Sequence, residues 1–324
     1  MTKAKRPSSS LIPHPSSILR IDGIVPVIPT PFTAREEIAE ADLQRLVEFA
    51  ILTRASCICL PAYGSEFYKM NETERHRVVQ IAVRQARGRV PVLAQSNHPS
   101  AKIAVEIAKR NEAMGADVIS FALPRQFAIP EPDMIRYCER ICRAVKRPVL
   151  IQDFNPGGGT VGANFCKALQ ASCPNFLYIK LEEPLMGPKV RAIRKATKNK
   201  LGVLEGWGGL YMTELFDFGI CGLMPGTGLC DLLEVVWSAL KQGRRSDAFD
   251  TFEKVMPLIS FSLQSLELYH HVEKRLLRAR GALREGGVRD AQWTPFPEAM
   301  HYTDELIERV LEEVDRVGMK RKPL

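Results

Sequence analysis

The chain has 324 residues, of which 45% are hydrophobic, and its net charge is +8. It is long enough to bury a barrel-sized core. No apolar run approaches the roughly 20 residues that cross a membrane, and no signal-peptide core is present, so we expect a soluble cytoplasmic protein with no membrane partner. Residues 1–20 carry +4 and residues 319–324 carry +3, so the body is nearly neutral and no nucleic-acid partner is expected.

Residues 1–20 are rich in serine and proline and contain basic but no acidic side chains, which predicts a disordered basic arm. The eight cysteines form no pair of CxxC units and have no accompanying histidine cluster. We therefore expect reduced thiols and no metal site.

Short apolar segments alternate with helix-length segments from Ile24 onward. Residues 101–114 illustrate the helical periodicity, because Ile103, Ile107 and Ala108 share one face. Eight strands in this arrangement predict an α/β fold, a (β/α)8 barrel over residues 21–230. An open doubly wound sheet is the alternative, but no glycine-rich dinucleotide fingerprint follows the first strand. The predicted strands are 24–29, 56–62, 90–95, 117–124, 148–154, 176–181, 202–206 and 221–226.

The alternation stops after Pro225. Residues 229–267 and 268–283 have helical patterns, a loop-like stretch follows, and residues 302–316 form an amphipathic helix. We assign residues 231–324 to a C-terminal helical region that is too short to be a separate catalytic domain.

Lys180 is the most informative residue. It follows the apolar residues 176–179 and precedes Leu181, so it lies in a segment with the composition of a buried strand. Burial disfavours the charged form of an amine and leaves a nucleophile that can form a Schiff base with a carbonyl. The alternative is a lysine at a strand end that reaches solvent or pairs with Glu182 or Glu183.

In a barrel of this type, catalytic groups lie at the carboxyl ends of the strands and in the loops that follow. Lys180 falls at the end of the sixth strand, in the predicted mouth. The other candidates at these positions are Tyr63, Gly64, Ser65, Arg125, Gln152, Asp153, Glu205, Gly226 and Thr227.

Five segments carry a family resemblance: "GIVPVIPTPFT", "LPAYGSEFYKMNETER", "RPVLIQDFNPGG", "YIKLEEP" and "GICGLMPGTG". Their order and spacing over about residues 21–316 resemble the dihydrodipicolinate synthase / N-acetylneuraminate lyase superfamily of class I aldolases. The resemblance implies a (β/α)8 barrel in which Lys180 forms an imine with a 2-oxo acid.

The chain departs from this family at several positions. The Gly-Thr-Thr-Gly-Glu motif, which holds the substrate carboxylate, is replaced by residues 62–66, so Tyr63 and Gly64 stand where the threonines are usual. Gln152 stands where the tyrosine proton shuttle is usual, and a carboxamide has no titrating proton near neutral pH. True synthases have an arginine after the strand-five motif that binds the carboxylate of the second substrate, and this chain has glycines at residues 157–159 instead. Arg125-Gln126 stands where the family has a tyrosine pair after the fourth strand.

Several side chains are candidates to take over these roles. Tyr63 could relay a proton or orient the imine, or simply pack at the rim. Arg125 is our choice for an anion contact, while Asp153 and Glu205 could hold substrate hydroxyls or bind backbone amides. The glycines around Gly226-Thr227 could present backbone amides to the substrate, or form an ordinary strand-to-helix turn.

These observations predict a Schiff-base-forming lyase, an aldolase or a dehydratase, whose small-molecule partner is a 2-oxo acid, preferably a sugar-derived 2-keto-3-deoxy acid. The alternatives are a dihydrodipicolinate synthase-like condensation of pyruvate with an aldehyde, and a catalytically weakened member that binds an oxo acid. No cofactor is expected beyond the imine. The family resemblance implies a homo-oligomer, a tetramer or a dimer, and aromatic residues near 265–274 and 293–296 suggest a contact surface.

Overall fold

The computed structural model describes residues 20–155, 158–284, 286–289 and 293–324. The predicted arm, except for Arg20, lies outside the described residues. Eight parallel strands form one sheet in the order β1-β8-β7-β6-β5-β4-β3-β2. A parallel bridge between Val27 and Cys59 joins the two edges, so the ring is closed. The strands are β1 Gly23–Ile24, β2 Ile58–Leu60, β3 Val92–Gln95, β4 Val118–Ala122, β5 Val149–Phe154, β6 Phe176–Glu182, β7 Gly202–Glu205 and β8 Gly222–Leu223.

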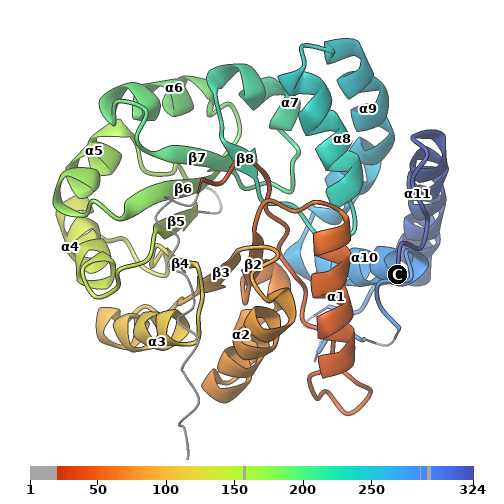
Figure 1. Ribbon diagram of the computed structural model, residues 1–324, viewed down its shortest axis with the longest axis horizontal. Helices are drawn as coiled ribbons and strands as arrows, with labels where there is room; N and C mark the ends of the chain where they lie inside the picture. The colour runs from red at the N-terminus through yellow and green to blue at the C-terminus, as the bar shows by residue number, and fades with distance from the viewer. Residues whose placement is uncertain (1–19, 156–157, 285, 290–292) are drawn as a thin grey trace, which may run out of the picture.

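Helices surround this ring, which confirms the predicted (β/α)8 barrel (Figure 1). The helices that connect successive strands bury apolar residues against the sheet, as parallel sheets with helical crossovers require. The helices are α1 Glu40–Leu52, α2 Glu72–Ala86, α3 Ala101–Ala113, α4 Glu131–Cys142, α5 Ala163–Ser172, α6 Gly187–Ala196, α7 Met212–Leu215, α8 Cys230–Lys241, α9 Arg245–Ser262, α10 Leu266–Ala279 and α11 Pro297–Arg316.

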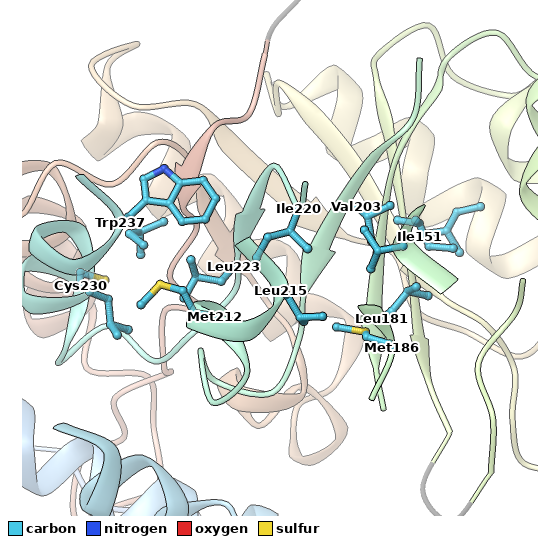
Figure 2. Close-up of a cluster of buried hydrophobic side chains, with 14 of the residues drawn as sticks. Ile151, Leu181, Met186, Val203, Met212, Leu215, Ile220, Leu223, Cys230 and Trp237 are labelled. Atoms are coloured by element: carbon cyan, nitrogen blue, oxygen red, sulfur yellow. The ribbon is translucent and has the colours of Figure 1, made fainter. Parts of the chain in front are cut away.

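The strands alternate between an inner and an outer layer of side chains. Leu150, Tyr178 and Leu204 are buried together inside the ring, while their neighbours on the same strands face the helices. Figure 2 shows part of the outer layer, where Leu181 and Val203 lie among apolar side chains that surround the ring. This alternation decides which polar side chains at the strand ends reach the mouth of the barrel.

The eighth barrel helix is α8, and it packs against β1. The C-terminal extension therefore consists of α9, α10 and α11 and begins after Lys241, which is later than the predicted boundary at residue 231. These three helices pack together at one side of the barrel (Figure 1). Helix α11 begins at Pro297, five residues before the predicted start at Tyr302.

The loop after β2 contains a short 3-10 helix, Tyr63–Ser65, and leads into α2. Asn71 and Glu74 form a capping box at the start of α2, with reciprocal hydrogen bonds of 3.0 Å between each side chain and the other residue's backbone N–H. This cap fixes where the loop ends and the helix begins. No helix in the described ranges is long and apolar enough to span a bilayer.

Candidate active site

A cavity of about 320 Å³ opens at the carboxyl ends of the strands. Side chains from β5 and β6 form one wall, and the loops after β2, β7 and β8 form others. The connection between α9 and α10 also lines the cavity through residues 263–266. The C-terminal extension is therefore part of the site rather than an appendage to the barrel.

Lys180 lies on the inner face of β6 and is only 5% exposed. Its Nζ is 3.0 Å from Oε1 of Glu182, two residues further along the same strand face. Gly206 on the neighbouring strand end allows these two side chains to fit, because a Cβ at this position would lie 2.3 Å from Cγ of Glu182 and 2.8 Å from Cε of Lys180. The predicted nucleophile is thus buried in the cavity beside a carboxylate.

Gln152 lines the cavity next to this pair, and its Cα is the register partner of the Cα of Lys180. Its Nε2 donates to Oε1 of Glu182 at 2.5 Å, and its Oε1 accepts from Nε2 of Gln95 at 2.8 Å. Both ends of the carboxamide are therefore used within the protein. Gln152 contacts Glu182, and its own amide has no proton to give near neutral pH.

Tyr63 also lines the cavity, and its ring centroid lies 5.2 Å from that of Phe154 on β5. Burial, and secondarily the charge of Glu182, raises the pKa of the Tyr63 phenol. The phenol therefore keeps its proton at neutral pH and can donate it.

Gly64 and Gly226 line the cavity as predicted. A Cβ at Gly226 would lie 2.5 Å from Oε2 of Glu273 and 2.9 Å from Oη of Tyr269. At Gly64, a Cβ would lie 3.2 Å from the Tyr269 ring. The lack of a side chain at both positions is explained by close packing against α10.

Five predicted contacts do not line the cavity, and these predictions are corrected. The hydroxyl of Ser65 donates to the carbonyl oxygen of Ile28 at 2.6 Å, and the hydroxyl of Thr227 donates to that of Val27 at 3.0 Å. Both side chains tie their loops to the residues that follow β1. Neither hydroxyl proton is therefore left for the substrate.

Arg125 and Asp153 form an ion pair in which Nε of Arg125 is 2.8 Å from Oδ1 of Asp153. The second oxygen of Asp153 accepts from the backbone N–H of Val161 at 2.7 Å. Asp153 follows Gln152 on β5 and so points to the outer layer. The arginine that we expected to bind a substrate anion is thus held by an internal carboxylate.

Glu205 likewise points away from the inner layer. Its carboxylate accepts from the backbone N–H groups of Trp207 at 2.9 Å and Gly209 at 2.8 Å. Burial raises the pKa of Glu205 to about 7. Glu205 holds the loop after β7 and does not line the cavity.

The cavity residues that were not predicted as site residues include Glu182, Trp207 and Tyr269. Glu182 had a usable signal, because it shares a strand face with Lys180. Tyr269 lies in the C-terminal extension, about ninety residues after the lysine, and no local pattern places it at the mouth. Among the described residues, no group of three or more His, Cys, Asp or Glu side chains is arranged to hold a metal ion.

The fold and the site define a (β/α)8-barrel enzyme with a buried lysine near the end of the sixth strand. The model of the dihydrodipicolinate synthetase family matches residues 20–290. The chain therefore belongs to this family, which confirms the resemblance.

The chain is 26% identical over 277 residues to an L-2-keto-3-deoxyarabonate dehydratase of Azospirillum brasilense, covering 84% of this chain and 87% of that protein. It is 28% identical over 159 residues to a putative 2-dehydro-3-deoxy-D-gluconate aldolase, YagE, of Escherichia coli, covering 49% of this chain and 53% of that protein. The crystal structure of YagE with pyruvate matches with a TM-score of 0.82 and 20% identity, over 89% of this chain and 98% of that one. The predicted enzyme class, a carbon–carbon or carbon–oxygen lyase, agrees with the names of these relatives.

Proposed function

We propose that this enzyme dehydrates a short 2-keto-3-deoxy sugar acid through an imine at Lys180. One observation carries the proposal: the cavity places a carboxylate, Glu182, 3.0 Å from the lysine amine. A nucleophile and an adjacent base are the two groups that an imine-linked proton abstraction requires. The relative from Azospirillum brasilense, which bears the name of a dehydratase, supports the same reaction class.

The steps follow from these positions. Lys180 attacks the C2 carbonyl, water leaves and an iminium forms. Glu182 takes a proton from C3 and gives an enamine, which expels the C4 hydroxyl as water with a proton from Tyr63. Hydrolysis of the conjugated iminium returns the Lys180 amine and an unsaturated 2-oxo acid, and the proton on Glu182 passes through water to Tyr63. The net reaction is the loss of one water molecule.

The substrate carboxylate has a candidate contact in the loop after β2. The backbone N–H groups of Tyr63 and Gly64 donate to no other described residue, whereas those of the next two residues donate within the 3-10 turn. Unpaired amides of this kind suit an anion.

The rest of the cavity favours a substrate with a neutral distal end. Gln264, Ser265 and Tyr269 line this region, and Lys180 is the only basic side chain among the described lining residues. A second carboxylate would therefore find no cation there and would lie near the charge of Glu182. We propose a monocarboxylate whose distal carbons carry hydroxyl groups.

Borohydride trapping tests the imine. Incubation with a 2-keto-3-deoxy pentonate or with pyruvate, followed by reduction and mass spectrometry, should add the mass of the acid at Lys180. The Lys180→Ala variant should show no adduct, and circular dichroism should confirm that it is folded. Labelling that persists in this variant would refute the assignment.

Product analysis separates dehydration from aldol cleavage. Proton NMR should show an unsaturated or tautomerised product with the substrate's carbon count, and a coupled lactate dehydrogenase assay should detect no pyruvate. The Glu182→Gln variant should lose about 10²–10⁴-fold in kcat, as expected for removal of an acid–base group. Stoichiometric pyruvate release would show an aldolase instead, and trapping without turnover of any sugar acid would favour an oxo-acid-binding protein.

We also propose that the enzyme is a cytoplasmic homo-oligomer. The eight cysteines are all unpaired, which suits a reducing compartment. Of the aromatic residues predicted as a contact surface, Tyr269 lines the cavity, whereas Phe296 is 57% exposed. Phe127, which was not part of that prediction, is 82% exposed. Light scattering at micromolar concentration should give a mass of two or four chains, and a mass near 36.3 kDa, that of one chain, would contradict the proposal.

A further inference from the structure

A row of buried polar side chains runs behind the cavity wall and ends at Glu182. Nδ2 of Asn97 donates to Oε1 of Gln95 at 2.7 Å, and Nε2 of Gln95 donates to Oε1 of Gln152 at 2.8 Å. Nε2 of Gln152 then donates to Oε1 of Glu182 at 2.5 Å. Gln95 and Asn97 are 1% and 6% exposed and do not line the cavity.

The direction of this row is fixed at its far end. The backbone N–H of Ala122 donates to Oδ1 of Asn97 at 2.7 Å, and a backbone N–H can act only as a donor. Asn97 must therefore turn its carbonyl toward Ala122 and its NH₂ group toward Gln95. Gln95 then accepts from Asn97 through its carbonyl oxygen and donates to Gln152 through its NH₂ group. Gln152 is oriented in the same way and presents its NH₂ group to Glu182.

This direction has a chemical consequence for Glu182. Its Oε1 receives one hydrogen bond from Gln152 and lies 3.0 Å from the amine of Lys180, so this oxygen is an acceptor. No described residue donates to the other oxygen, Oε2, which leaves it to take a proton from the substrate. Carboxamides do not titrate near neutral pH, so the row keeps its direction as the pH changes.

We propose that Asn97 and Gln95 are positioning residues that hold Glu182 ionised as the base of the reaction. The inference rests on the proposed function, because it assigns the base of that reaction. The reaction requires an ionised carboxylate, because a carboxyl group that already holds a proton cannot take one from C3 of the imine.

The Asn97→Asp variant tests the direction of the row. A carboxylate there would still accept from Ala122, but its second oxygen would need a donor, so Gln95 and Gln152 would each turn over. Gln152 would then present its carbonyl oxygen to Glu182, which would have to carry a proton to donate to it. We expect the acidic limb of the kcat/KM profile to move up by about one pH unit or more, a tenfold change in proton affinity.

Two further variants keep the test sharp. Gln95→Met interrupts the row without adding charge and should move the same limb upward by a smaller amount. Asn111→Asp is the matched control, because Asn111 is also buried and hydrogen-bonded to the backbone oxygen of Gln95 but lies outside the row. An infrared difference spectrum against Glu182→Gln should show a protonated carboxyl band in Asn97→Asp at a pH where the wild type shows none.

The outcomes separate this inference from the proposed function. If borohydride labels Lys180 in every variant but the acidic limb stays in place in both Asn97→Asp and Gln95→Met, the inference fails while the imine chemistry stands. An equal shift in Asn111→Asp would assign the effect to added charge and would also overturn it. Absence of labelling in the wild type would refute the proposed function itself.

Discussion

Replacing Gly206 with alanine should disable the enzyme while leaving most of its fold intact. The added Cβ would lie 2.3 Å from Cγ of Glu182, 2.8 Å from Cε of Lys180 and 2.9 Å from the carbonyl oxygen of Leu181. The first two atoms belong to side chains that can move. The third is backbone, and it accepts the N–H of Gly206 itself at 3.0 Å, so it cannot retreat without loss of that bond.

The magnitude follows from this geometry. An sp³ carbon needs more than 3 Å from its neighbours, so the stems of Lys180 and Glu182 must shift by about 1 Å or adopt other rotamers. Overpacking of this kind costs about 1–3 kcal/mol of stability, and a displacement of about 1 Å at reacting groups costs about 10²-fold in rate. We therefore expect kcat/KM to fall by about 10² or more, with a smaller loss in the free energy of unfolding.

Urea denaturation and the rate of borohydride trapping at Lys180 measure the two effects separately. Gly159→Ala is the control, because a Cβ there would meet only Oε2 of Glu183 at 3.8 Å, an ordinary contact. This control should keep both wild-type stability and wild-type labelling. Full activity of Gly206→Ala would refute the argument that Lys180 and Glu182 react from the positions described.

Three other predictions follow from the site. The enzyme should not make dihydrodipicolinate from pyruvate and aspartate semialdehyde, since Gln152 cannot shuttle protons, and a coupled assay with ordinary turnover would contradict this. Arg125→Met should cost roughly 3 kcal/mol in urea denaturation by leaving Asp153 without its cation, with little change in KM, whereas a large rise in KM would restore the anion-binding role. Burial raises the pKa of Glu205 and Glu273 from 4.5 to about 7. The folded state then binds more protons than the unfolded state across this window, so the free energy of unfolding should fall by about 3 kcal/mol per group as pH rises through it, and a flat profile would be the contrary result.

Much of the barrel could be predicted from the sequence, because buried parallel strands are short, apolar and regularly spaced. The lysine could be predicted for the same reason, since a charged residue inside such a strand stands out. The end of the barrel could not, because α8 and α9 are both amphipathic and only the contact of α8 with β1 shows which one completes the ring.

Asp153 and Glu205 were wrongly expected to reach the substrate because every residue at a strand end was treated as facing the mouth. Gln152 and Asp153 are adjacent, so alternation alone sends one to the cavity and the other to the outer layer. Glu205 falls on the outer face of β7 for the same reason. Applied strictly, the period of two would have selected Glu182 and set aside Asp153 and Glu205. The hydrogen bonds of the Ser65 and Thr227 hydroxyls to the residues after β1 are tertiary contacts that this pattern does not predict.

Three carboxylates near the mouth of the barrel have different contacts, which depend on the strand face or helix that carries each one. Glu182 lies on the inner face, where an amine and a carboxamide keep it an acceptor beside the cavity. Glu205 lies on the outer face of the next strand, and Glu273 comes from α10 to accept the N–H of Gly228 at 2.8 Å, so both are used by loop amides. The two loop carboxylates hold the loops after β7 and β8, which line the cavity beside Lys180 and Glu182. The C-terminal extension therefore helps to shape the cavity, because without α10 the loop after β8 would lose the carboxylate that fixes it.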